Sequence, residues 1–404
     1  MSISLTVSIE CELLRMTMSN LEVNCMRFGL SENELSFRDE IQLFVRNEVT
    51  PSAHERDIQD IYPTEIIKSM ARKGYTTLTV PTRYNGLGKS KLDACILMEE
   101  VAYGCAATAI SLITIFQAET MLLLYGNEKA KDVFLPKFRD GLISSYALTE
   151  SGRGSDIRHL DTKAVRKGNQ WVINGRKTFI TSGSAAEFFI ILAETEVGVS
   201  VFAVERDVLG VRTEMGELSE TFGLRNGPHV DVVLEDVVVE DYQLIGIEGK
   251  GLKQAVTTLN NSRTIAAAIS IGIARAAYDY SLDWVNQRSA FDQKVFEFQG
   301  IQWMFAHMLT NINAARLLTY RAATLLDQEG QSAISEASQA KLFAGTMATK
   351  VCEDAVQVCG AFGTTINAPL GRFLRDAKAY EIAGGSNEIL RNTIAKEIGK
   401  AMPS

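Results

Sequence analysis

Apolar residues recur at helical spacing through the first third of the chain. Ser31 and Glu34 form a capping-box pattern directly before the amphipathic run 35–45. Proline and glycine separate the later helical patterns, which predict helices at 64–74, 91–103, 105–124 and 128–139. We therefore expect an N-terminal helical domain over residues 31–142. Residues 1–30 lack the basic start of a signal peptide, and we interpret them as a disordered extension.

A change of period near residue 143 marks a second region. Short runs of β-branched and apolar residues predict strands at 162–166, 188–193, 199–204 and 230–239. Residues 170–173 and 176–180 are interpreted as a strand pair joined at Asn174-Gly175, a two-residue hairpin signal. We therefore expect a central β domain over residues 143–246.

The helical period returns in the rest of the chain. No proline occurs within residues 229–368, which suits long helices because proline interrupts them. We expect four such helices at 250–288, 297–328, 333–359 and 383–400. Helices of this length need partners, so residues 247–404 are predicted to form a helical bundle. The expected fold class is mainly α with a central β domain.

Composition narrows the classes of function. Apolar residues make up 46% and charged residues 22%, which is an ordinary globular balance. No uncharged apolar run reaches the ~18 residues of a membrane span. The formal net charge of −8 argues against nucleic acid as a partner. Six cysteines without a CxxC pair and four distant histidines predict neither disulfides nor a metal site, and indicate a reducing, cytoplasmic location.

Five segments carry the candidate chemistry. The first is 146–156, a run with two glycines and three hydroxyls whose free backbone N–H groups suit an anion or a heteroaromatic ring. The others are 179–182, 288–291 with Gln299, 357–363 and 372–389. Taken singly, each has a structural explanation: Arg288 as a solvated helix-end charge, Gly360 as a helix C-cap, Phe179 as a core residue.

Together, in this order and spacing, the five segments resemble the acyl-CoA dehydrogenase family over about residues 31–400. The resemblance implies an N-terminal helical domain, a β-barrel-like middle domain and a C-terminal four-helix bundle, usually assembled as a homotetramer. It also implies that FAD lies between the middle domain and the bundle, with its adenine end reaching a neighbouring subunit.

The resemblance assigns residues to two parts of the cofactor. The flavin set, which would surround the ring and its N5 atom, consists of Tyr146, Leu148, Thr149, Gly154, Ser155, Phe179 and Thr181. The adenine set, which would hold the diphosphate and adenine of a neighbour's FAD, consists of Arg288, Phe291, Gln299, Gln357, Gly360 and Gly363. Ser386 and Glu388 would touch the nucleotide part. An arginine suits this task because its guanidinium pairs bidentately with a pyrophosphate.

The catalytic base is where the sequence departs from the family pattern. Members remove an α-proton with a glutamate while a hydride leaves to flavin N5, and they keep this glutamate at one of two places. Those places correspond to Gly384 and to Ser262, which precedes Arg263, so neither holds a carboxylate. A serine hydroxyl is too weak a base to substitute unaided. The resemblance nevertheless places Ser262, Arg263 and Gly384 at the catalytic position.

The expected substrate contacts also depart from the pattern. Asn260 stands where an aspartate often contacts the pantetheine arm, which Ser155 and Arg263 would also approach. Arg153 replaces a residue that is usually small; it would hold an anionic substrate group or else lie solvated at a loop tip.

Three functions are compatible with these residues. The first is an FAD-dependent oxidoreductase acting on an acyl thioester of CoA or of a carrier protein, with an unusual base or an unusually acidic substrate, and with an electron-acceptor protein or oxygen as its partner. The second is an eliminating lyase, for example a desulfinase, on the same fold. The third is a flavin-binding protein without catalytic activity.

Overall fold

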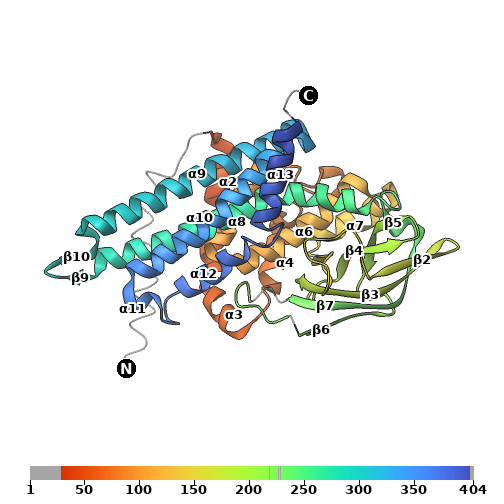
Figure 1. The fold of residues 1–404 in the computed structure, drawn as a ribbon, viewed down its shortest axis with the longest axis horizontal. Coiled ribbons are helices and arrows are strands. Elements are labelled where there is room, and N and C mark those ends of the chain that lie inside the picture. Colours follow the sequence, from red (N-terminus) through yellow and green to blue (C-terminus); the bar gives the residue numbers. More distant parts are fainter. Residues whose placement is uncertain (1–28, 218, 226, 228, 401–404) are drawn as a thin grey trace.

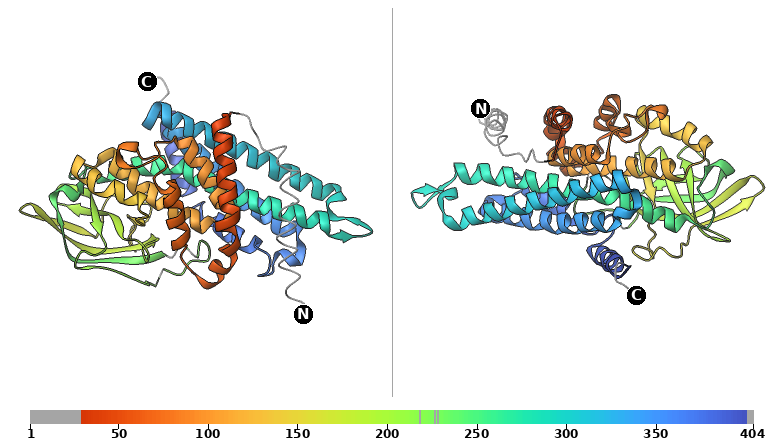
Figure 2. Two further views of the ribbon diagram at one scale, coloured as in Figure 1. Left: turned by 180° about the vertical axis from the view of Figure 1, so that it is seen from behind. Right: turned by 90° about the horizontal axis from the view of Figure 1, so that it is seen from above.

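The computed structural model describes residues 29–217, 219–225, 227 and 229–400 (Figure 1). Helices lie at both ends of the described part of the chain, and the β-sheet that comes between them in sequence lies at one end of an elongated molecule (Figures 1 and 2). The mainly α fold with a central β domain is confirmed. Apart from Gly29 and Leu30, the extension interpreted over 1–30 lies outside the described residues.

The N-terminal helices follow the apolar pattern closely. They are α2 (Glu32–Phe44), α3 (Ala53–Gln59), α4 (Thr64–Lys73), α5 (Lys91–Gly104), α6 (Ala106–Tyr125) and α7 (Glu128–Arg139). The capping box of α2 forms as predicted, because the Glu34 N–H donates to the Ser31 hydroxyl and the Ser31 N–H donates to the Glu34 carboxylate. α6 is long and apolar enough to cross a membrane, but 78% of its most apolar window is buried inside the protein.

The middle of the chain forms a mixed sheet. Its strands are β1 (Ser144–Ala147), β2 (Lys163–Lys167), β3 (Gln170–Thr181), β4 (Phe188–Thr195), β5 (Gly198–Glu205), β6 (Val211–Glu214), β7 (His229–Glu240) and β8 (Leu244–Ile245). The strand order is β6-β7-β3-β2-β4-β5-β8, and β1 pairs in parallel with β4. β1 was not predicted as a strand.

The predicted hairpin at Asn174-Gly175 is wrong. β3 runs unbroken through these residues, and the turn lies instead at Gly168-Asn169, where Lys167 of β2 faces Gln170 of β3. At Asn174-Gly175 the pairing of β3 with β7 shifts register. A Cβ on Gly175 would lie 2.5 Å from the Thr162 hydroxyl, so this glycine permits a close approach rather than a turn.

The C-terminal region is built on four helices: α8 (Gly251–Gln287), α9 (Gln299–Glu329), α10 (Ile334–Val358) and α13 (Asn387–Lys400). A small hairpin of β9 (Ser289–Ala290) and β10 (Gln293–Lys294) joins α8 to α9. The short helices α11 (Gly360–Gly363) and α12 (Leu370–Ala379), neither of them predicted, lie between α10 and α13. The fourth helix begins later than the predicted residue 383 because Gly384 and Gly385 both have positive φ.

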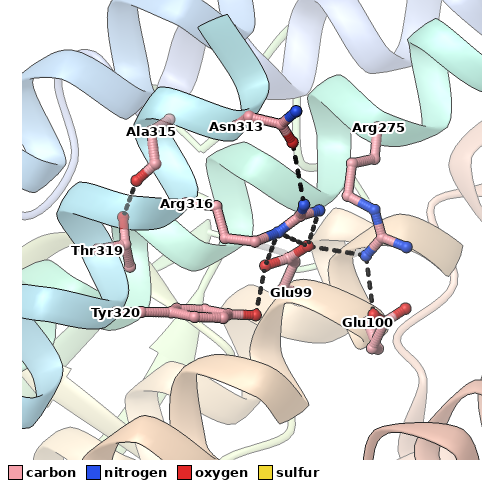
Figure 3. A network of polar contacts seen from close by, with 8 residues as sticks. All are labelled: Glu99, Glu100, Arg275, Asn313, Ala315, Arg316, Thr319 and Tyr320. Carbon is pink, nitrogen blue, oxygen red and sulfur yellow. Dashed lines mark hydrogen bonds and ion pairs between the residues drawn. The ribbon is translucent and has the colours of Figure 1, made fainter. Parts of the chain in front are cut away.

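A buried network of charges joins the N-terminal helices to the bundle (Figure 3). Glu99 on α5 accepts hydrogen bonds from Arg316 on α9 (2.7 Å) and from Arg275 on α8 (2.9 Å). The Tyr320 hydroxyl donates to the same carboxylate at 2.9 Å. Burial alone would raise the pKa of Glu99, but the two guanidinium groups outweigh it and hold this pKa at about 2. The network fixes α5, and therefore the N-terminal domain, against α8 and α9.

Candidate functional site

Two of the five segments meet where strands β1 and β3 end. The Thr178 N–H donates to the Thr149 carbonyl at 2.9 Å, and the Ser145 hydroxyl donates to the Thr181 carbonyl at 2.5 Å. These bonds lay the end of β1 and the residues after it against the end of β3. The structure therefore brings the Tyr146–Thr149 part of the flavin set next to Phe179 and Thr181.

A buried ion pair that the sequence did not reveal holds this junction. Lys177 of β3 donates to the Glu150 carboxylate at 2.7 Å, and both side chains are almost fully buried. Glu150 also accepts from the backbone N–H and the hydroxyl of Thr162. Burial lowers the pKa of Lys177 to about 8. Glu150 directly follows Thr149 of the flavin set. The Lys177–Glu150 ion pair therefore holds the chain in place just after the end of β1.

The junction has features that fit a flavin ring. Phe179 is 43% exposed and has φ of +56°, which turns an aromatic side chain out of the strand at a backbone conformation that non-glycine residues seldom adopt. The hydroxyls of Tyr146 and Thr178 are buried without a hydrogen-bond partner in the described residues. An exposed aromatic ring next to hydroxyls without partners suits a planar ligand with polar edges.

The remainder of the first segment is an open loop. Gly154 and Ser155 are exposed, and a Cβ on Gly154 would meet no atom within 4 Å. Arg153 lies 4.0 Å from Asp161, another exposed side chain, which is a weak surface contact. Arg153 is partly exposed here, and both of its expected roles, holding an anionic substrate group or lying solvated at a loop tip, stay predictions.

The adenine set gathers at the opposite end of the molecule. Arg288 ends α8, and Phe291, with φ of +51° and 90% exposure, lies in the β9–β10 hairpin. Trp284 stacks on Phe362 at a ring separation of 4.0 Å, which ties the end of α8 to the short helix α11. Figure 1 shows this end of the bundle far from the sheet. The rest of the set, also at this end, consists of Gln299, Gln357, Gly360 and Gly363.

The last segment lies in a third place, before α13. Ser386 precedes the helix, and its hydroxyl accepts from the Ile389 N–H at a long 3.5 Å. Glu388 is exposed on the first turn and pairs with Arg391 at 3.2 Å. Neither residue approaches the flavin set through any described contact.

Gly384 and Ser262, the two positions that correspond to the glutamate of the family, differ in their surroundings. Gly384 has φ of +71°, and a Cβ there would meet no atom within 4 Å. Ser262 is buried on α8, where its hydroxyl donates to the Thr258 carbonyl at 3.1 Å. One turn before Arg263, the Asn260 side chain is buried with its carbonyl oxygen unpartnered. A free acceptor at this point fits an amide N–H of a pantetheine arm.

Arg263 and a lysine that the sequence did not single out flank this region. Arg263 donates to the Ser338 hydroxyl at 2.9 Å, and burial lowers the pKa of its guanidinium to about 10. Lys341 of α10 donates to the Gly385 carbonyl at 2.6 Å. In the sequence Lys341 looks like any lysine of an amphipathic helix, and only the packing of α10 against residues 383–386 reveals its position.

Comparison with known proteins gives a consistent result. Models of the acyl-CoA dehydrogenase N-terminal, middle and C-terminal domains match residues 31–141, 145–237 and 249–399. An acyl-CoA dehydrogenase of Bacillus subtilis is 34% identical over 374 residues, covering 91% of this chain and 98% of that protein.

Solved structures agree. Butyryl-CoA dehydrogenase from Megasphaera elsdenii superposes with a TM-score of 0.89 at 31% identity, covering 92% of this chain and 100% of that one. The prolyl acyl carrier protein oxidase AnaB superposes with a TM-score of 0.87 at 27% identity, with coverage of 92% and 100%. Members of the family bind FAD, as in the FAD complex of PigA. The chain belongs to the acyl-CoA dehydrogenase family of FAD-dependent oxidoreductases.

Proposed function

We propose that this protein oxidises an acyl thioester, bound to CoA or to a carrier protein, at the carbon–carbon bond next to the thioester carbonyl. The observation that carries the proposal is the junction of Thr149 with Thr178 and of Ser145 with Thr181. This junction brings an exposed aromatic ring and hydroxyls without partners together where β1 and β3 end. FAD supplies the hydride acceptor when it is bound.

The flavin set holds and orients the ring in this proposal. Thr149 and Thr181 offer hydroxyls to the polar edge of the ring, and hydrogen bonds there favour its reduced, more anionic form. Phe179 covers one side of the ring. The distance between the sheet and the far end of the bundle supports a role for Arg288 and the rest of the adenine set toward the FAD of a neighbouring subunit, within a homotetramer.

The substrate arm lies along α8 in this proposal. Asn260 accepts from the pantetheine amide with its unpartnered buried oxygen. Arg263 lies one helical turn further along the same face, so it approaches the acyl end of the substrate. Because Ser262 and Gly384 provide no carboxylate, the substrate must lose its α-proton more readily than a simple saturated thioester. We also propose a cytoplasmic location and reoxidation by an electron-acceptor protein or by oxygen.

The likeness to AnaB favours a carrier-protein thioester as the second form of substrate, since the name of that protein specifies an acyl carrier protein. The eliminating lyase needs a cation for its leaving group. Arg153, on its exposed loop, is the residue that favours this alternative.

Mass spectrometry of the products separates these functions. The FAD-loaded protein is incubated with matched CoA and carrier-protein thioesters and with an electron acceptor. A product that has lost two hydrogens supports oxidation. A product that has lost a leaving group without oxidation supports the lyase, and unchanged substrate across the panel supports a binding role.

A further inference from the structure

Two buried cations meet beside Gly385 without a counter-anion. Arg263 is 5% exposed and Lys341 is 1% exposed. The Lys341 ammonium donates to the Gly385 carbonyl at 2.6 Å, and one Arg263 Nη atom lies 3.7 Å from the position of a Cβ on Gly385. In the part of the chain that the structure describes, neither cation makes an ion pair, and the Nε of Arg263 has no hydrogen-bond partner.

The nearest carboxylates are engaged elsewhere. Glu381 pairs with Lys378 at 3.2 Å and accepts from the Asn387 amide. Glu388 pairs with Arg391 on the exposed first turn of α13. Burial and the charge of Arg263 lower the pKa of Lys341 to about 7, and they outweigh Glu381 and Glu388, which act in the opposite direction. An uncompensated buried charge costs several kcal/mol, so this place favours an incoming anion.

Open space adjoins the backbone next to Gly385. Gly384 lies next to Gly385 in sequence, and no atom lies within 4 Å of the Cβ that Gly384 lacks. Asn260 lies one turn from Arg263 on α8, and its buried side-chain oxygen has no hydrogen-bond partner. A pantetheine arm bound to Asn260 would direct the acyl group of the substrate toward Arg263 and Lys341.

We propose that Arg263 and Lys341 form a binding site for an acid group, a carboxylate or a sulfinate, on the acyl part of the substrate. The inference rests on the proposed function, because it names the class of acyl thioester that the same site accepts. The proposed acid site also explains why positions 262 and 384 hold serine and glycine instead of glutamate. A glutamate at either position would bring a negative charge close to the cations and would repel the acid group of the substrate.

The same charges act on the neighbouring carbon. Positive charge close to the acyl group favours the anion that forms when the α-proton leaves, so the α-carbon becomes more acidic. The site therefore selects the substrate and weakens the need for a strong base.

Binding of matched thioester pairs to the FAD-loaded protein tests the proposal by calorimetry. The pairs are succinyl-CoA with butyryl-CoA, glutaryl-CoA with valeryl-CoA, and 3-sulfinopropionyl-CoA with butyryl-CoA. Each pair shares the CoA part, so the ratio of dissociation constants isolates the acid group. We expect the acidic member to bind about ten- to a hundredfold more tightly, as a charge-assisted hydrogen bond provides. The acid group that binds more tightly, carboxylate or sulfinate, is the one that the site prefers. Equal dissociation constants within every pair overturn the proposal.

Variants localise the effect. Lys341→Met and Arg263→Gln are each expected to reduce the preference for the acidic member about tenfold. Lys350→Met, at an exposed lysine on the same helix, should leave it unchanged. An undiminished preference in Lys341→Met overturns the assignment, and the wild-type comparison stands even if Arg263→Gln does not fold. Tight acid binding without turnover contradicts the proposed oxidation alone, whereas turnover of neutral thioesters without any acid preference contradicts this inference alone.

Discussion

At the scale of single residues, the proposed chemistry depends on the residues at positions 262 and 384. The Ser262 hydroxyl is occupied by the Thr258 carbonyl one turn earlier, as serines inside helices commonly are. Gly384 has a backbone conformation that side chains rarely adopt. The sequence pointed to Ser262 and Gly384 but not to Lys341. A lysine in a helical pattern gives no indication of which groups its ammonium will contact in the folded protein.

Restoring a carboxylate on α8 should change the substrate range. Ser262→Glu is expected to raise turnover of a neutral thioester such as butyryl-CoA, since general-base catalysis typically contributes about 10²–10⁴-fold. It should also weaken binding of succinyl-CoA, because the new carboxylate lies next to Arg263 in the chain. Steady-state kinetics on both substrates measures the change.

Gly384→Glu is the less suitable variant, because Gly384 has a positive φ that a glutamate would adopt only with strain. If the wild-type protein already turns over butyryl-CoA as fast as Ser262→Glu does, a base is present elsewhere and this explanation fails.

The acid preference should depend on pH. The charged groups around Lys341 are Arg263 on α8, Glu381 after α12 and Glu388 on α13, and together with burial they place the pKa of Lys341 at about 7. The protonated lysine attracts the acid group, so the preference for succinyl-CoA over butyryl-CoA should fall as the pH rises through this value. Calorimetry from pH 6 to 9 measures the ratio of the two dissociation constants. In Lys341→Met this ratio should no longer depend on pH.

At the scale of helices and strands, the periodic pattern predicted most long elements and failed where close packing decided the structure. α4 to α7 and the three long bundle helices lie within a few residues of their predicted bounds. Asn174-Gly175 carries the usual signal of a hairpin, yet the packing of Gly175 against Thr162 makes it a shift of register instead. Similarly, the meeting of β1 with β3 depends on contacts between residues about thirty positions apart, which no local pattern reveals.

The contact between the N-terminal helices and the bundle should depend on Glu99. Glu99→Gln leaves the guanidinium group of Arg316 buried without its carboxylate (Figure 3). Arg275, which is only partly buried, keeps its ion pair with Glu100. Breaking a buried ion pair costs about 3–5 kcal/mol, and urea unfolding should show a loss of this size. Glu65→Gln removes an exposed pair with Lys68 and should change the unfolding free energy by less than about 1 kcal/mol. If Glu99→Gln changed the unfolding free energy as little as Glu65→Gln does, the structural role of the Glu99 network would be contradicted.

At the scale of the whole molecule, the flavin set and the adenine set lie at opposite ends of one chain (Figure 1). The order of segments along the sequence predicted both sets, but it contained no information on their separation. In the proposed function one FAD contacts both sets, so we expect each complete cofactor site to be formed by two copies of the protein.

Arg288→Ala should therefore lower FAD occupancy and oligomer stability together, because a ligand stabilises the state that binds it. We expect FAD affinity to fall about tenfold or more, which corresponds to the loss of a charge-assisted contact. Light scattering and the absorbance of bound flavin measure the two quantities. Lys294→Ala, which alters an exposed lysine in the same hairpin, provides the matched control. A wild-type protein with full FAD and the mass of one subunit would contradict the shared site.

Anaerobic titration of the FAD-loaded wild-type protein with acyl thioesters tests the central claim most directly. Oxidised flavin absorbs at about 450 nm, and this band disappears when the flavin is reduced. Oxidation of the thioester predicts that succinyl- or glutaryl-CoA, or the corresponding carrier-protein thioesters, bleach the band in stoichiometric amounts, while butyryl-CoA does so slowly. A band that remains unchanged with every thioester in the panel would contradict the claim that this protein is an acyl-thioester oxidoreductase.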